Sequence, residues 1–132
     1  VHYAEELWPG FICNLMIVRA PLIDESPELV RQLVAGAVRS GMWAKSHLSA
    51  AAAIASRYWH QPAALVAYAL DTPEGRIRFD RYMPRSEEIQ VIADLMVRFG
   101  LAETSDIDGL IDDRFAREIP AGDVATLHHI FR

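Results

Sequence analysis

The sequence predicts a mainly helical fold with one or two short strands. Over several long stretches, apolar residues recur at intervals of three and four, the pattern of helices that bury one face. A single run rich in β-branched residues, Phe11 to Val18, departs from that pattern and is typical of a strand covered on both faces. With 132 residues, 52% of them hydrophobic, the chain is long enough to bury one core.

The predicted strand covers about residues 11–18. A turn at residues 8–10 precedes it and Pro21 follows it. We interpret residues 2–7 as the end of an element that begins further upstream. Cys13 is the only cysteine, which excludes an internal disulfide, and within an apolar strand it is predicted to be a small buried hydrophobic side chain.

The helix predicted over about 27–43 has the clearest start signal in the chain. Ser26 offers an N-cap oxygen, Pro27 takes the first helical position where its missing N–H costs nothing, and Glu28 lies in the positively polarised first turn. One face of this helix carries an apolar stripe that we expect to be buried, formed by Val30, Leu33, Val34, Ala37, Val38 and Met42.

Three more helices are predicted over about 47–59, 62–70 and 86–99. The last has a regular apolar stripe, and Gly100 is well placed as the residue that follows its C-terminus. Between the second and third, residues 76–80 alternate in polarity. They are predicted to be extended or to form a second short strand.

The final predicted helix covers about 105–118, and residues 120–132 are predicted to be a tail. Ser105 and Asp108 have the spacing of a capping box, although Gly109 interrupts the pattern. The tail is weakly patterned, so we expect it to be either partly disordered or docked on the helices.

Charge and hydropathy exclude several functions. The net charge is −5 and the 13 basic residues are scattered singly, so we expect no nucleic-acid partner. No apolar run approaches the roughly 18 residues that a transmembrane helix needs. The chain starts with Val and without a signal-peptide pattern, which we interpret as processing or truncation.

No catalytic or metal-binding motif is complete. The adjacent His128 and His129 have no further ligand at suitable spacing, and residues 104–115 fail the calcium-loop pattern because Phe115 replaces the final Glu. His60 ends a helix, where a protonated side chain suits the negative terminus. Nucleophile-elbow and phosphate-loop motifs are missing from the sequence. We therefore expect no enzyme activity, no cofactor and no metal.

An ordered set of short motifs runs along residues 5–119. The first half contains Val18-Arg19 at the end of the strand, the acidic helix start Asp24 to Pro27, the segment Ser40 to Trp43, and the helix Ala52 to Trp59. The second half contains the helix Tyr82 to Leu101 and the closing Asp108 to Phe115 (DGLIDDRF). Taken together, the set resembles the later half of periplasmic substrate-binding proteins of ABC importers, in the branch that handles nitrate, bicarbonate, sulfonates, taurine and thiamine precursors.

The resemblance implies the C-terminal segment of a two-lobe α/β periplasmic-binding-protein (type II) fold, here over residues 1–119. It implies the solute-binding component of an ABC-type import system in the periplasm, which binds without catalysis. Its partners would be a small-molecule solute, in the intact protein, and the ABC permease. By the same analogy, Trp8, Gly10 and Asn14 are ligand-binding positions. Asn14 falls where anion binders can carry a basic residue, which argues against an inorganic anion.

Two other hypotheses remain open. One is a helical dimerisation or interaction module with no small-molecule ligand, and the other is a small enzyme or cofactor-binding domain that uses His60 or residues 106–113. An apolar strand with few partners in its own chain exposes its edges and faces. We therefore expect the isolated chain to be a homo-oligomer, most simply a two-fold dimer in which strands pair or helices are exchanged.

Overall fold

The computed structural model describes residues 2–8, 11–120, 122 and 124–131, and these residues form helices and connections without a β-strand. The mainly helical class predicted from the sequence is therefore confirmed. None of the helices in these ranges is long and apolar enough to cross a membrane. The elements are α1 (Ala4–Leu7), α2 (Ala20–Glu25), α3 (Pro27–Ser46), α4 (Leu48–Trp59), α5 (Ala63–Asp71), α6 (Ser86–Arg98), α7 (Arg114–Arg117) and the 3-10 helix η1 (Leu127–Phe131).

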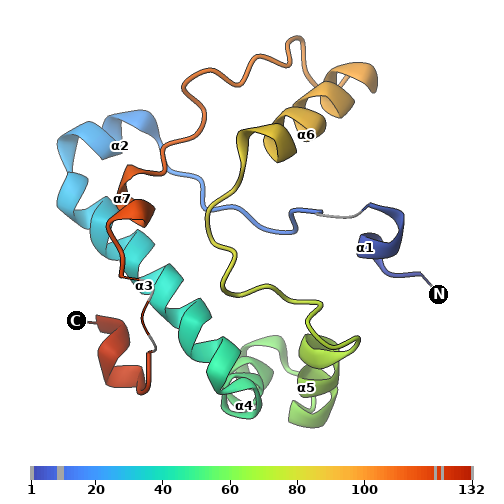
Figure 1. Ribbon diagram of the computed structural model, residues 1–132, viewed down its shortest axis with the longest axis vertical. Coiled ribbons are helices and arrows are strands. Elements are labelled where there is room, and N and C mark those ends of the chain that lie inside the picture. The colour runs from blue at the N-terminus through green and yellow to red at the C-terminus, as the bar shows by residue number, and fades with distance from the viewer. Residues whose placement is uncertain (1, 9–10, 121, 123, 132) are drawn as a thin grey trace.

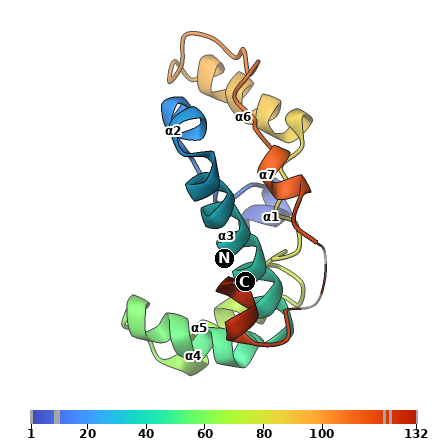
Figure 2. The ribbon, with the colours of Figure 1, turned by 90° about the vertical axis from the view of Figure 1, so that its left-hand side faces the viewer.

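The long helix α3 is the centre of the fold (Figure 1). Helices α2, α4, α7 and η1 all contact it, while α5 packs on α4. In the side view, α2 and α6 lie toward one end of α3, and the α4–α5 pair lies at the other end (Figure 2). Twenty helical residues span roughly 30 Å, so the elements at the two ends of α3 share little core.

The buried face of α3 is narrower than its sequence predicts. Val30, Val38 and Trp43 are buried, whereas Leu33 is 48% exposed. Trp43 forms a small core cluster with Val124 and Ile130 from the C-terminal residues. Of the two predictions for the tail, docking is therefore the correct one for these residues.

Helices α3, α4, α5 and α6 each begin within one residue of the position predicted from the sequence. Their start signals come from residues close to the helix start, so they can be recognised in the sequence. Their predicted starts were 27, 47, 62 and 86, and the observed first residues are Pro27, Leu48, Ala63 and Ser86. Gly100 adopts the left-handed conformation predicted for it, with a φ of 70°. One detail is wrong, since the Ser26 side chain makes no capping hydrogen bond. Ser26 also ends α2, and its amide donates to the carbonyl of Leu22.

The prediction of a strand over 11–18 is wrong for this chain. These residues run as an extended connection from α1 to α2, and no hydrogen bond joins the backbone of residues 12–18 to another described residue (Figure 1). A strand exists only with a paired neighbour, and the described parts of the chain supply none. Residues 76–80 likewise form bends and turns in place of a second strand.

The helix predicted over 105–118 is also wrong, apart from the single turn of α7. Side chains compete here for the backbone amides that a helix would use: Thr104 accepts from the amide of Asp106, and Asp106 accepts from the amide of Asp108. Gly109 has a φ of 70°, which no right-handed helix contains. The predicted capping box therefore does not start a helix.

Helix α2 is not predicted from the sequence, because Pro21 is placed as the boundary after the apolar run. In the structure this proline lies in the first turn of α2, where its missing N–H would be unpaired in any case. Residues 19–26, which connect the apolar run to α3, are thus mostly helical.

Candidate functional site

An apolar groove of about 500 Å³ runs along α3. Its floor is the buried side of that helix, and its walls come from residues 14–18, the connection 79–84 and the approach to α7 at 110–116. The floor and walls are mostly aliphatic and aromatic, which suits an apolar occupant. The α3 residues in the groove are Val30, Val34, Ala37 and Val38.

The charged groups at the groove are neutralised by their own neighbours. Asp113 lies 2.6 Å from the guanidinium of Arg117, whose hydrogen bond lowers the pKa of that carboxyl. Asp112 lies 2.9 Å from Arg114 Nε. Asn14, which is exposed, adds an uncharged amide to the wall. The groove therefore presents apolar surface with one amide, and no free charge that would select an ion.

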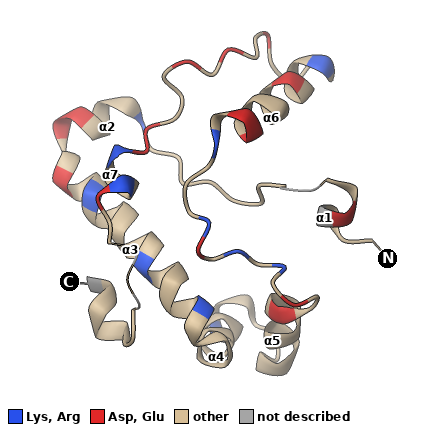
Figure 3. Cartoon of the chain, viewed as in Figure 1, with Lys and Arg blue, Asp and Glu red and all other residues tan. Residues whose placement is uncertain are grey.

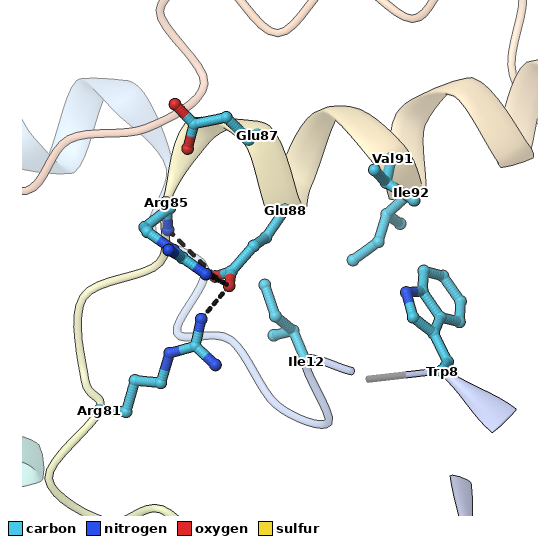
Figure 4. Close-up of a pocket in the computed structure, with 8 residues that line it drawn as sticks. All are labelled: Trp8, Ile12, Arg81, Arg85, Glu87, Glu88, Val91 and Ile92. Atoms are coloured by element: carbon cyan, nitrogen blue, oxygen red, sulfur yellow. Dashed lines mark hydrogen bonds and ion pairs between the residues drawn. The ribbon is translucent and has the colours of Figure 1, made fainter. Parts of the chain in front are cut away.

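A second pocket of about 500 Å³ lies between the N-terminal residues and α6 (Figure 4). Trp8 and Ile12 face Val91 and Ile92 of α6 across its apolar half. Its other half is polar and is formed by Arg81, Arg85, Glu87 and Glu88.

The polar half of this pocket is organised by Glu88. Arg85 Nη2 lies 2.6 Å from Glu88 Oε1, Arg81 also pairs with that oxygen, and the amide of Arg85 donates to the other oxygen at 3.4 Å. As the third residue of α6, Glu88 also satisfies the positive end of the helix. Two arginines and two glutamates leave no excess charge for an ion, and no nucleophile lies among the lining residues.

The structure separates the ligand-binding residues predicted from the sequence. Trp8 lines the second pocket, where its ring also lies 5.7 Å from that of Phe11, while Asn14 lines the groove. Gly10 lies outside the described residues. Trp8 and Asn14 therefore do not share a pocket in this chain, and their ligand-binding role stays a prediction.

Sequence reasoning did not identify Arg81, Arg85 and Glu88. Their signal is present in the stretch DRYMPRSEE, where charges surround Pro84 and Glu88 stands three residues after Arg85, the N-cap position of the helix. The groove floor, in contrast, comes from the apolar stripe of α3, which the periodicity did predict.

Metal ligands do not gather in the described residues, where no three His, Cys, Asp or Glu side chains are placed to share an ion. His128 and His129 lie on η1 and are both exposed. Basic side chains are distributed over α3, the 76–85 connection, α7 and the ends of α4 and α6 (Figure 3).

The chain exposes more surface than its mass requires. Its accessible surface is 9837 Å², whereas a compact monomer of 14.8 kDa exposes roughly 7,000 Å². Part of the excess is apolar and lies at the groove, where Leu15, Met16 and Ile17 are all more than half exposed.

Comparisons with family models, curated proteins and solved structures gave no significant match. The resemblance in the motifs and this geometry are therefore the basis for a functional proposal.

Proposed function

We propose that the chain is the C-terminal part of the solute-binding component of an ABC-type import system. The intact protein would have the two-lobe α/β type II fold of the nitrate, sulfonate and bicarbonate branch, and would act in the periplasm. Its lobes would close over a small solute, and the closed form would dock on the permease, with no catalytic step. The ordered motifs between residues 5 and 119 support this proposal.

The excess of exposed surface is the observation that carries the proposal. The difference between 9837 Å² and the value expected for a compact monomer is roughly 2,800 Å², which is within the range of permanent protein interfaces. A chain that forms one part of a larger protein would bury such a surface against the remainder. The apolar groove and the extended residues 11–18 lie where that remainder would pack.

The same proposal assigns Trp8, Gly10 and Asn14 to the solute cleft. An amide both donates and accepts hydrogen bonds, and an indole ring covers an apolar group. This pair of side chains suits an organic solute, such as a sulfonate or a pyrimidine-like molecule, better than a bare inorganic anion. Trp8 and Asn14 would then need the missing lobe to bring a solute against both of them.

The sequence encoded upstream of Val1 gives the first test. A signal peptide followed by roughly 150 residues of alternating strands and helices supports the proposal. A start codon close to Val1 contradicts it.

Calorimetric titration of the extended protein gives the second test. Nitrate, bicarbonate, taurine and a thiamine-precursor pyrimidine are titrated into it and into the 132-residue chain. The proposal expects tight binding of one solute to the extended protein only. Replacing Trp8 or Asn14 by Ala should weaken that binding, whereas replacing the exposed Leu101 should not. Failure of every solute to bind the extended protein would reject the proposal.

A second function has its own support, namely a helical interaction module without a small-molecule ligand. Residues 15–17 are apolar and exposed beside an apolar groove, which is typical of a protein-binding surface. This function predicts association of the chain in the absence of any solute.

A further inference from the structure

We infer that residues 11–18 are a docking strand, and that in the isolated chain its partner is the same strand of a second copy, paired antiparallel. This inference rests on the interaction-module function proposed above and names its partner and its geometry. It does not require the solute-binding function.

The backbone of this segment defines the kind of partner. No hydrogen bond joins the backbone of residues 12–18 to another described residue, so within the described parts of the chain its consecutive amides and carbonyls have no partner. The amide of Phe11, by contrast, donates to the carbonyl of Trp8. A helix laid on this segment would cover its side chains but leave its backbone groups unpaired, because helices bond internally. An extended strand satisfies the backbone groups and also sets its own side chains beside those of this segment.

The side chains of residues 11–18 are mostly apolar, so contact with a second strand is more favourable for them than contact with water. Alternate residues point to opposite sides of an extended chain, so Phe11, Cys13, Leu15 and Ile17 share one side. On that side Ile17 is 90% exposed, which makes it the most exposed of the large hydrophobic side chains in the described residues. On the opposite side, Ile12 and Val18 are partly buried, whereas Asn14 and Met16 are exposed. Pairing would therefore place the exposed side chains of the two copies next to one another, while Ile12 and Val18 keep their contacts with their own chain.

A second copy fits because the segment is self-complementary. Residues 11–18 carry no charge, so antiparallel pairing sets no like charges against each other (Figure 3). A two-fold axis perpendicular to the paired strands keeps equivalent sides together, so the bare sides of both copies form one apolar surface. With the axis at Asn14, the two amides face each other and every other pair is apolar, Phe11 facing Ile17 and Cys13 facing Leu15.

The area available is sufficient for such a dimer. The excess surface of roughly 2,800 Å² is summed over the whole chain and exceeds the roughly 800 Å² that each partner buries in an ordinary stable interface; Phe11, Leu15, Met16 and Ile17 contribute to it. Residues 14–18 also form one wall of the apolar groove of about 500 Å³, so the paired strands would lie next to further apolar surface.

Sedimentation velocity of the 132-residue chain, from the low to the high micromolar range, tests the inference. We expect a dimer at tens of micromolar. Ile17→Lys places a charge on the bare side, and Met16→Pro removes an amide that no described residue uses in the monomer. Each should weaken dimerisation by at least about tenfold. Leu101→Lys is the matched control, since Leu101 is 73% exposed elsewhere in the chain, and it should leave the dimer intact.

Cross-linking at Cys13 tests the register. Cys13 is the only cysteine, and the prediction that it is buried is wrong because no strand forms around it; it is exposed, so a bifunctional maleimide can react only there. With the axis at Asn14 the two Cys13 Cα atoms lie roughly 8 Å apart, within reach of a short linker. Efficient cross-linking of the wild type, lost in Ile17→Lys, is the expected result. Circular dichroism of each variant confirms that the helices are retained.

Three results would overturn the inference. The first is a monomeric wild type at every concentration, and the second is a dimer that Ile17→Lys and Met16→Pro leave unchanged. The third is a dimer that Leu101→Lys disrupts equally, which would place the interface on another surface. None of these results depends on a solute, so they leave the titrations of the extended protein as an independent test of the solute-binding function.

Discussion

Two glycines in α3 allow the packing of the chain on this helix to be measured. A Cβ built on Gly41 would lie 3.0 Å from the carbonyl oxygen of Phe79, whereas a Cβ on Gly36 would meet no atom within 4 Å. Both glycines lie within α3, where alanine is favoured over glycine by about 1 kcal/mol. We therefore expect Gly36→Ala to stabilise the fold by about 1 kcal/mol.

Gly41→Ala should behave differently because it adds a methyl group against backbone. The contact at 3.0 Å requires the main chain at Phe79 to move, and overpacking of this kind costs about 1–3 kcal/mol. Subtracting the helix-propensity gain leaves a destabilisation of about 0–2 kcal/mol. The two variants should therefore differ by about 1–3 kcal/mol in their free energy of unfolding.

Urea unfolding followed by far-ultraviolet circular dichroism measures this difference. All three proteins are compared at one concentration, because association would add to the apparent stability. Equal stabilisation by both substitutions would refute the reasoning, since it would mean that the connection before α6 does not pack on α3 at Gly41.

Three further predictions concern single contacts. At pH values above 3.8, the ordinary pKa of an aspartate carboxyl, Asp80→Asn should lower the free energy of unfolding by about 0.5 kcal/mol. The substitution removes the ion pair between Asp80 and Lys45, whose atoms lie 2.8 Å apart. The hydrogen bond from Lys45 lowers the pKa of Asp80, so this contribution is lost as pH falls below 3.8 and through the lowered value, and unfolding at several acid pH values checks it. Val30→Ala should cost about 2 kcal/mol because Val30 is 2% exposed, while Leu33→Ala should cost less than half as much, a difference that the urea midpoints would reveal. Ser26→Ala should change stability by less than about 0.5 kcal/mol, since its side chain caps nothing, and a loss of about 1 kcal/mol would indicate a cap formed in solution.

The parts of the fold that were predictable are those set by neighbouring residues. Pro27 and Glu28 lie within one turn of the start of α3, and Gly100 acts on the last turn of α6. The helix predicted over residues 105–118 does not form, apart from α7. The side chains of Thr104 and Asp106 accept hydrogen bonds from the amides of Asp106 and Asp108, and these bonds compete with those of a helix.

The extended segment shows the limit of sequence patterns. Residues 11–18 have the composition of a strand, but pairing depends on residues far away in the chain or outside it. The same limit applies to the candidate site. The apolar stripe of α3 predicted the groove floor. The separation of Trp8 from Asn14 was not predictable, because it depends on where residues 79–92, far away in the sequence, pack against the N-terminal residues.

Hydrogen–deuterium exchange of residues 12–18 tests the central claim most directly, namely that this segment is unpaired in the single chain and forms a strand only by pairing with a second copy. At protein concentrations where the chain is monomeric, we expect its amides to exchange at the rates of an unstructured peptide, while those of α3 remain protected. At high concentration the amides of 12–18 should become protected, and those of 101–109 should not change. Protection of 12–18 at every concentration would show that the segment is paired within its own chain, and exchange without protection at every concentration would show that it has no partner strand. Either result would contradict the account.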